Sequence, residues 1–430
     1  MAVFTVNTTA DKINPSDGVI SLREAIALAN NNPGQDTILF QLEPGQQTIT
    51  LDSNPLNLPN IPSLPNIPSL PNIPSLPNIP SLPDIPNLPT LENQPTLEIT
   101  ESVNIVGLQE PDQITIEGDG GSFDIFTISN GANVTVTNLT ISEGEDGIQV
   151  DDGNLNVINS ILTDNKSDGI KIEGDNANVN VVGSSFTKNT SDGIEIAGEN
   201  TNLKVINTIF TENKSDGIEI AGENTNLNVV GSSFISNEKD GINIKANNTT
   251  SFVSKSTFSQ NGDNGFDINA VGQNVKVIDS TIIKNEDTGI EIGTSEEVTN
   301  NVVQIFNSDI IENLTGGSGG GVSVLGIDNE VLLVNNQITG NSAEVNGGGI
   351  AVDSGNTMFL GNNTITDNIA DSDNNGTGDG GGLFIGLGAI VGIRASQITD
   401  KVDLGGEYRN VFGNFFDLGD NDIAGNDIQV

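Results

Sequence analysis

The feature that most constrains this chain is a repeat of 24 residues. The phrase "SDGIEIAGENTNL" begins at Ser191 and again at Ser215. Each unit contains short β-branched runs separated by Asn, Gly, Asp and Ser, which is typical of strands and tight turns. Three rows of residues keep the period: Gly169, Gly193, Gly217, Gly241, Gly265 and Gly289; Asn165, Asn189, Asn213, Asn237, Asn261 and Asn285; and Phe186, Phe210, Phe234 and Phe258. A period near this length without helical segments predicts an all-β parallel β-helix, a solenoid with one coil per repeat.

In such a solenoid, equivalent residues of neighbouring coils stack about 4.8 Å apart. The sequence therefore predicts Val, Ile and Phe inside the coil, and an asparagine ladder whose amides bond along the axis. We expect the Gly that follows each Asp to supply the positive φ of a tight corner. About twelve coils predict a rod roughly 60 Å long.

Residues 1–54 predict a small strand-helix cap. Ser21 can cap a helix, and Glu24 completes a capping box. One face of this helix is apolar. It consists of Leu22, Ala25, Ile26 and Ala29.

The remaining boundaries follow from changes in composition. Residues 55–95 are low in complexity, and Pro recurs at every third position from Pro59 to Pro89. That spacing is the polyproline II period, and it predicts a stiff insert docked through an apolar edge; a proline-motif ligand is the functional alternative. Residues 96–400 carry the coils, and residues 401–430 predict a terminal cap and tail.

Two stretches resemble known bacterial families. "TVNTTAD" and "DGVISLREAIALANNNPGQDTILF", between Thr5 and Phe40, resemble the CSLREA domain, with Ile20 in place of the usual Cys. That domain precedes surface β-helix proteins of the pectin-lyase-like class. "FTKN", "FTEN", "FISN", "FSQN" and "GGGI" are similar to repeats of polymorphic outer-membrane proteins, some of which are adhesins. The resemblance, with the handedness rule for parallel crossovers, implies a right-handed β-helix.

Composition excludes several kinds of site. The chain has no Cys and no His, which removes disulfides, thiolate metal sites, a Cys nucleophile and a Ser-His-Asp triad. The net charge of −43 argues against nucleic acid and anionic membranes as partners. An uninterrupted apolar run of membrane-spanning length and a cleavable signal are both missing from this sequence. We therefore expect an extracellular or cell-surface location reached without a cleavable signal, and the sequence leaves a cytoplasmic one open.

Enzymatic activity is disfavoured because the carboxylates repeat in every coil, whereas catalysis needs one asymmetric constellation. Asp151 and Asp152 form an isolated pair, and hydrolase and epimerase motifs of this class require His. A lyase needs an Arg base near a calcium cluster. Of the three arginines, Arg23, Arg394 and Arg409, only Arg394 lies near the predicted coils. We predict no catalytic residue and no bound organic cofactor.

Calcium is the one candidate metal. The predicted ligands stack along one corner: Asp192, Asp216 and Asp240, with Glu195 and Glu219 beside them. A hard cation would relieve the repulsion between like charges about 5 Å apart. The alternative is that each Asp serves the turn, with Lys166 and Lys214 softening the field.

The sequence thus predicts a non-enzymatic secreted or surface protein, structural or adhesive, whose partners are surface or matrix proteins or glycans. The alternative is a protein that binds polysaccharide or degrades it as a lyase. Fold alone does not choose between these functions. An open coil end also predicts end-to-end self-assembly.

Overall fold

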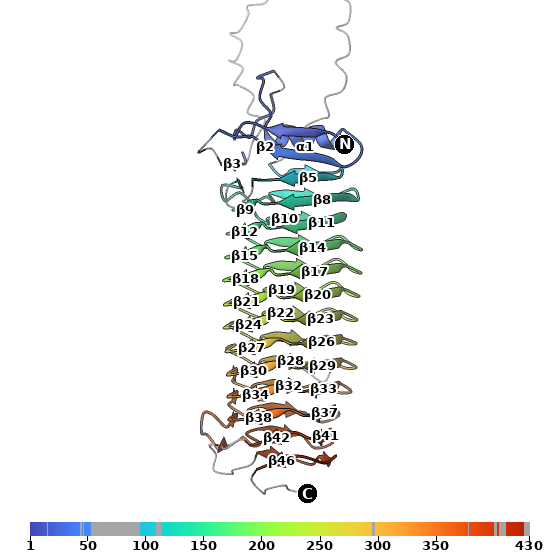
Figure 1. Cartoon of the computed structure of the whole chain (residues 1–430), viewed down its shortest axis with the longest axis vertical. Coiled ribbons are helices and arrows are strands. Elements are labelled where there is room, and N and C mark those ends of the chain that lie inside the picture. Colours follow the sequence, from blue (N-terminus) through green and yellow to red (C-terminus); the bar gives the residue numbers. More distant parts are fainter. Residues whose placement is uncertain are drawn as a thin grey trace, which may run out of the picture.

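The structure is a computed structural model, which describes residues 1–14, 16–43, 45, 47–52, 95–108, 114–294, 297–376, 378–399, 402–403 and 410–424. The predicted polyproline insert lies outside these residues apart from Pro95. The chain is a long parallel β-helix whose coils stack from the N-terminal cap to the C-terminus (Figure 1).

Three long parallel sheets run the length of the rod, and each coil contributes one strand to each sheet. Sheet A has 15 strands. They are β1 (Val3–Val6), β2 (Asp36–Phe40), β5 (Val103–Val106), β8 (Ala132–Thr137), β11 (Gly153–Ile158), β14 (Asn178–Val182), β17 (Asn202–Ile206), β20 (Asn226–Val230), β23 (Thr250–Ser254), β26 (Asn274–Ile278), β29 (Val302–Phe306), β33 (Glu330–Val334), β37 (Thr357–Gly361), β41 (Ile390–Arg394) and β45 (Phe416–Asp417).

Sheet B has 14 shorter strands. They are β3 (Thr48–Thr50), β6 (Thr115–Glu117), β9 (Thr140–Ser142), β12 (Ile161–Thr163), β15 (Ser185–Thr187), β18 (Ile209–Thr211), β21 (Ser233–Ile235), β24 (Thr257–Ser259), β27 (Thr281–Ile283), β30 (Asp309–Ile311), β34 (Gln337–Thr339), β38 (Thr364–Thr366), β42 (Gln397–Ile398) and β46 (Asp422–Ile423).

Sheet C has 13 strands. They are β4 (Leu97–Ile99), β7 (Phe126–Ile128), β10 (Ile148–Val150), β13 (Ile170–Ile172), β16 (Ile194–Ile196), β19 (Ile218–Ile220), β22 (Ile242–Ile244), β25 (Phe266–Ile268), β28 (Ile290–Ile292), β32 (Val322–Val324), β36 (Ile350–Val352), β40 (Leu383–Ile385) and β44 (Val411–Phe412).

The later coils are longer, and their additional residues form a short fourth sheet of β31 (Leu314–Thr315), β35 (Ser342–Ala343), β39 (Ile369–Ala370) and β43 (Val402–Asp403). Strand pairing also continues beyond residue 400. β44, β45 and β46 extend sheets C, A and B as far as Ile423.

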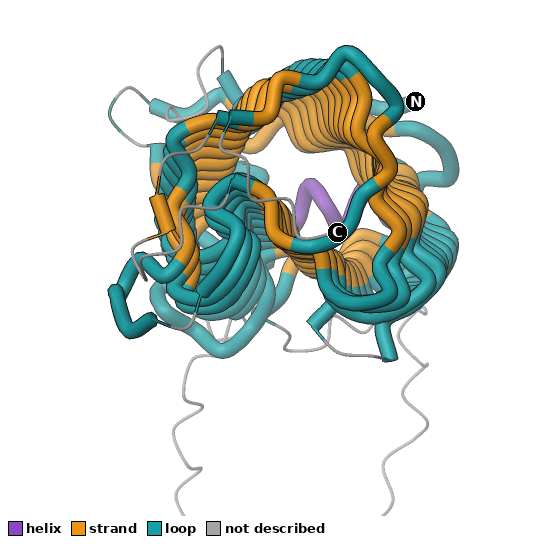
Figure 2. The backbone as a smooth tube through the Cα atoms, turned by 90° about the horizontal axis from the view of Figure 1, so that it is seen from below, coloured by secondary structure: helices purple, strands orange, loops and turns teal. Residues whose placement is uncertain are grey.

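The N-terminal cap is built into the rod. α1 (Leu22–Asn30) begins at Ser21, whose hydroxyl accepts from the backbone N–H of Glu24 at 3.1 Å. The Glu24 carboxylate accepts from the N–H of Ser21 at 2.9 Å, so the predicted capping box is confirmed. The predicted apolar face of α1 is buried. Seen along the axis, α1 lies across the far opening of the coil (Figure 2), while β1 and β2 form the first rungs of sheet A.

The stacked rows are as the period predicts. Phe186, Phe210, Phe234 and Phe258 are fully buried, with successive ring centroids 4.8 to 4.9 Å apart. Burying a side chain of this size stabilises the fold by about 1.5–3 kcal/mol. The regular spacing follows from the parallel registers, which pair each Phe with the next.

The asparagine ladder is equally regular. From Asn165 to Asn285, each Nδ2 donates to the Oδ1 of the ladder residue in the next coil at 2.9 to 3.0 Å. The same Oδ1 atoms also accept backbone N–H groups of the preceding coil. The ladder therefore satisfies backbone groups inside a corner where water is excluded.

The expected role of the glycine row is wrong. None of the glycines in this row has a positive φ. At this corner the positive φ falls on the residue just before each ladder asparagine, such as Lys188 (φ 58°) and Glu212 (φ 56°). A Cβ on Gly193 would lie 2.5 Å from the carbonyl oxygen of Gly217 and 2.5 Å from the Phe210 ring. Gly is required there because the neighbouring coil leaves no space for a side chain.

Candidate functional site

The outward face of sheet C lies between two ridges of turns. Residues 212–217 connect sheet B to sheet C and residues 221–225 connect sheet C to sheet A, whereas only residues 207–208 connect sheet A to sheet B. Viewed along the axis, two stacks of turns project on either side of one row of strands (Figure 2). We call the surface between these ridges the sheet C face.

The middle residue of each sheet C strand points outward onto this face, because its two neighbours are buried. These residues are register partners and form what we call the central column. In order along the axis it contains Glu98, Thr127, Gln149, Lys171, Glu195, Glu219, Asn243, Asp267, Glu291, Ser323, Ala351, Phe384 and Phe412. The column is therefore acidic in the middle and aromatic near the C-terminal end.

A second row of acids follows the corner that precedes sheet C. This aspartate row consists of Asp124, Asp146, Asp168, Asp192, Asp216 and Asp240. Each Oδ1 accepts the backbone N–H of the equivalent residue in the next coil, at 2.7 to 3.1 Å, and the last bond reaches Asn264. Each Asp thus serves the corner, as one of our two interpretations predicts, and keeps its second oxygen for other partners.

Burial shifts the pKa of these acids upward. Loss of hydration raises the pKa of Asp192 to about 6 and that of Asp240 to about 9, the latter also because Asp216 repels it. Burial likewise raises the pKa of Asp267 to about 8, with repulsion from Glu291, whose own pKa rises to about 7. Backbone N–H donors act in the opposite direction at Asp192 and do not cancel the cost of burial.

Two lysines act as fixed counter-ions on the sheet C face. Lys171 lies 3.5 Å from carboxylate oxygens of Glu173 and Glu195. Lys245 donates to Glu219 at 2.5 Å and lies 4.0 Å from Asp216.

The lysines predicted for this role, Lys166 and Lys214, lie elsewhere. Lys166 donates to the carbonyl of Gly120, and Lys214 pairs with Glu238. Both lysines lie in turns between sheets B and C and bond other groups there. They therefore do not neutralise the predicted calcium ligands.

Part of the predicted calcium set comes together. Asp192, Asp216 and Glu219 each offer a carboxylate oxygen, and these oxygens all lie within 4.8 Å of one another. Asp240 and Glu195 are not in this group: the Oδ2 of Asp240 accepts from the Asn243 amide at 2.9 Å, and Glu195 pairs with Lys171. The three grouped carboxylates could hold a hard cation, although Lys245 already lies against two of them.

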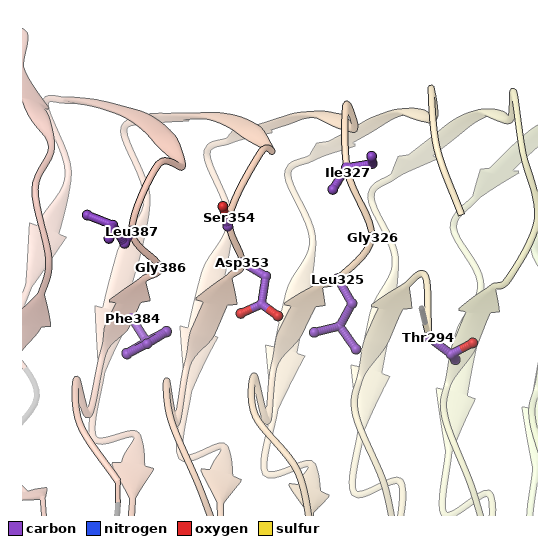
Figure 3. A pocket seen from close by; sticks show the side chains of 9 residues that line it. All are labelled: Thr294, Leu325, Gly326, Ile327, Asp353, Ser354, Phe384, Gly386 and Leu387. Carbon is purple, nitrogen blue, oxygen red and sulfur yellow. The ribbon is translucent and has the colours of Figure 1, made fainter. Parts of the chain in front are cut away.

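Hollows open at the two ends of the sheet C face. One of about 490 Å³ is lined by Leu325, Ile327, Asp353, Phe384 and Leu387, with smaller residues between them. Figure 3 shows these side chains on successive coils along one face. The Phe384 ring is half-buried and stacks on Phe412, with ring centroids 5.3 Å apart.

The other hollow, about 540 Å³, lies at the N-terminal end of the aspartate row. Its lining includes Asp124, Asp146, Gln149 and Lys171. This hollow is polar and acidic, in contrast to the partly apolar hollow beside Phe384.

The arginines considered for lyase chemistry do not meet the acids. Arg394 is exposed at the end of β41, in sheet A, whereas the acids line sheet C. Arg23 is buried, donates to both carboxylate oxygens of Asp11 at 2.8 and 2.7 Å, and bonds the carbonyl of Pro95 at 2.6 Å. It therefore joins the cap to the first coil. Arg409 lies outside the described residues.

Sequence reasoning missed the part of the column beyond Glu219. Asn243, Asp267 and Glu291 continue the 24-residue spacing of Glu195 and Glu219. The period alone could have placed them on the same face. The hydrogen-bond partners of these three residues could not have been predicted from the period.

A family model described as a right-handed beta helix region matches residues 125–253 and 197–336. The coils form a right-handed parallel β-helix. No curated protein matches the sequence.

Solved structures with a similar architecture include the A-module of the Azotobacter vinelandii mannuronan C-5 epimerase AlgE6, at 16% identity and a TM-score of 0.47, covering 98% of this chain and 99% of that one. The Dettilon tailspike protein is 13% identical with a TM-score of 0.40, covering 90% of this chain and 66% of that one. Pectate lyase Pel9A is 14% identical with a TM-score of 0.30, and the match covers 98% of this chain and 79% of that one. At such identities these proteins' activities are not transferred to this chain. In the described part of the chain, no helix has the length and apolarity needed to cross a bilayer.

Proposed function

We propose that this chain is a non-enzymatic structural or adhesive protein, secreted or held at the cell surface, which binds its partner along the sheet C face. The proposal rests on one observation, which is that the carboxylates of the aspartate row repeat from coil to coil. The aspartate row places one carboxylate per coil in the same hydrogen bond, over six successive coils. A repeated face suits attachment to an extended or repetitive surface, whereas catalysis needs one unique arrangement.

The positions of the arginines support the same proposal. Arg394 lies on sheet A, and Arg23 is used in the buried pair with Asp11. The partner classes that fit a rod of this kind are surface or matrix proteins and glycans. End-to-end assembly remains a prediction.

Polysaccharide binding is the second candidate, and the hollow beside Phe384 favours it. A half-buried aromatic ring, an apolar Leu387 and the carboxylate of Asp353 line one concave surface. Sugar rings pack on apolar side chains and donate hydroxyl hydrogens to carboxylates.

The test is depletion of the purified chain from solution by surfaces coated with matrix proteins and by insoluble polysaccharides. The variant is Phe384→Ala, and the matched control is Phe252→Ala, which removes a 37% exposed ring from β23 in sheet A. Retention on protein-coated surfaces that Phe252→Ala leaves unchanged supports the adhesive proposal. Depletion by a polysaccharide that is lost in Phe384→Ala but kept in Phe252→Ala supports the second candidate. Depletion by no surface contradicts both.

A further inference from the structure

The most exposed large apolar side chains of the rod gather on one of its three long sheets. In the described strands of sheet A they belong to Val3, Leu39, Phe252, Val302, Ile390 and Phe416. The described strands of sheet B carry one, Ile209, and those of sheet C carry none. Contiguous apolar surface on a protein marks an interaction site, so the outward face of sheet A is a candidate for one.

The same face carries almost no negative charge. The sheet A strands from β8 to β29 contain neither Asp nor Glu, whereas the sheet C face carries the aspartate row and the acidic column. From β26 to β41 the charged residues that point outward on sheet A are Lys276, Glu330 and Arg394. Two copies of a chain with a net charge of −43 repel each other through most of their surface. Sheet A is the face at which this repulsion is smallest.

Three outward columns run along sheet A, whose strands stack along one side of the rod (Figure 1). They arise because each five-residue strand points its first, third and fifth residues outward. Between β26 and β45 the columns become largely apolar, and we call this surface the sheet A patch. The first column contains Asn274, Val302, Glu330, Thr357 and Ile390; the middle one Lys276, Gln304, Leu332, Phe359, Gly392 and Phe416; and the last Ile278, Phe306, Val334, Gly361 and Arg394.

We propose that a second copy of this chain packs on the sheet A patch. The two rods lie side by side and antiparallel, related by a two-fold axis that runs along the strand direction between β33 and β37. Each residue then faces the residue of the same column at an equal distance beyond the axis. Leu332 faces Phe359 of the second copy, and Val302 faces its Ile390. Each contact occurs twice, because a two-fold interface uses the same patch on both copies.

The charges of the patch select the antiparallel arrangement. It places Arg394 of one copy against Phe306 of the other, where a guanidinium and an aromatic ring attract each other. Within one copy, the Lys276 Nζ already lies 5.3 Å from the centroid of the Phe306 ring. The acid Glu330 faces the hydroxyl of Thr357. Parallel rods would instead place Lys276 against Lys276 and Glu330 against an apolar side chain.

The size of the overlap predicts a reversible dimer. The patch spans six strands, β26, β29, β33, β37, β41 and β45, and covers roughly 30 Å by 17 Å. This is roughly 500 Å² per copy and about 1,000 Å² in total, near the lower limit for a specific interface. The sheet C face lies on another side of the coil and stays open in both copies. The inference therefore does not depend on the proposed adhesive function.

The test is sedimentation equilibrium of the purified full chain over a wide range of protein concentration. The wild-type chain should change from monomer to dimer as the concentration rises. Leu332→Asp places a carboxylate in the middle of the patch and should raise the dissociation constant of the dimer by at least about tenfold. The matched control is Asn228→Asp, which adds the same charge to the middle column on β20, outside the overlap. It should leave dimerisation unchanged.

Cysteine cross-linking gives a second measurement that does not depend on the folding of Leu332→Asp. The chain has no Cys, so a single introduced thiol marks one position. Thr357 and Thr250 are both exposed residues of the first column, but Thr357 lies beside the proposed axis and Thr250 lies four strands away, on β23. A short bis-maleimide should therefore link Thr357→Cys into covalent dimers and leave Thr250→Cys unlinked.

Circular dichroism verifies that each variant is folded. The proposal is overturned if the wild-type chain stays monomeric over the whole range, which would leave the sheet A patch to a partner of another kind. It is also overturned if Leu332→Asp and Asn228→Asp weaken dimerisation equally, or if the two cysteine variants are linked equally.

Discussion

Replacing Asn213 by Ala should destabilise the middle of the rod strongly. The Asn213 amide donates to the Phe186 carbonyl at 3.2 Å and to Asn237 at 2.9 Å. Its Oδ1 accepts the backbone N–H of Asn189 at 3.2 Å and the Asn189 side chain at 3.0 Å. The variant therefore loses four hydrogen bonds in a corner from which water is excluded.

The expected loss can be estimated from those bonds. A typical intramolecular hydrogen bond contributes about 1 kcal/mol net, and a buried N–H left without an acceptor costs about 1–3 kcal/mol. We therefore expect Asn213→Ala to lower the free energy of opening of its coil by roughly 3–5 kcal/mol. Because a repeat array opens locally, native-state hydrogen exchange of the β15 to β21 segment is the appropriate assay.

The matched control is Asn202→Ala in the same coil. Asn202 also bonds its equivalents in neighbouring coils, at 3.0 Å to Asn178 and 3.0 Å from Asn226, but its side chain is exposed. Water can replace those bonds, so we expect a change of at most about 0.5 kcal/mol. Equal losses in the two variants, or a loss below about 1 kcal/mol in Asn213→Ala, would refute the reasoning that burial gives the ladder its strength.

Three further predictions follow from packing and charge. Phe234→Ala removes a fully buried ring whose centroid lies 4.8 Å from those of Phe210 and Phe258. The free energy of opening measured by hydrogen exchange should fall by about 3–5 kcal/mol. The control Phe252→Ala removes a partly exposed ring and should lower it by less than about 1 kcal/mol. Arg23→Ala leaves the carboxylate of Asp11 buried without its ion pair and should destabilise the cap by about 3–5 kcal/mol; adding Asp11→Ala should cost less than the sum of the single changes, and strict additivity would show that the pair is not coupled. Stability in chelator should fall as pH rises from about 4 to 9, because the pKa values of Asp192, Asp267 and Asp240 are raised from 3.8 to about 6, 8 and 9. Their folded forms bind protons more tightly than their unfolded forms, so this contribution is complete below about pH 4 and lost above pH 9. Denaturant unfolding at several pH values measures it, and a stability that rises with pH would contradict it.

The stacking of the rows could be predicted from the sequence because it depends only on the period. Residues 24 positions apart meet on neighbouring coils whatever the shape of the coil, and the Asn213 and Phe234 rows follow directly. The role of Gly193 could not be predicted this way. It depends on how closely the next coil approaches, and the sequence pattern carries no measure of that distance.

The counter-ions and the acceptor at position 243 show the same limit. Lys214 and Lys245 both lie near acids in the repeat, but only the chain path decides that Lys245 reaches Glu219 while Lys214 pairs with Glu238. The substitution of Glu by Asn at position 243 is visible in the sequence. The carbonyl oxygen of Asn243 has no donor among the described residues because the carboxylates of Asp216 and Asp240 hold its amide nitrogen. The sequence pattern does not show this orientation.

The measurement that tests the central claim most directly is the chain length of polysaccharides incubated with the protein and Ca²⁺. A panel of neutral and acidic polymers is followed by size-exclusion chromatography and by absorbance of unsaturated ends, together with the fraction of protein retained on each polymer and on protein-coated surfaces. We predict that the rod is retained on at least one surface and that every polymer keeps its length. Shortened chains or unsaturated ends, abolished by replacing residues of the sheet C face, would contradict a non-enzymatic function.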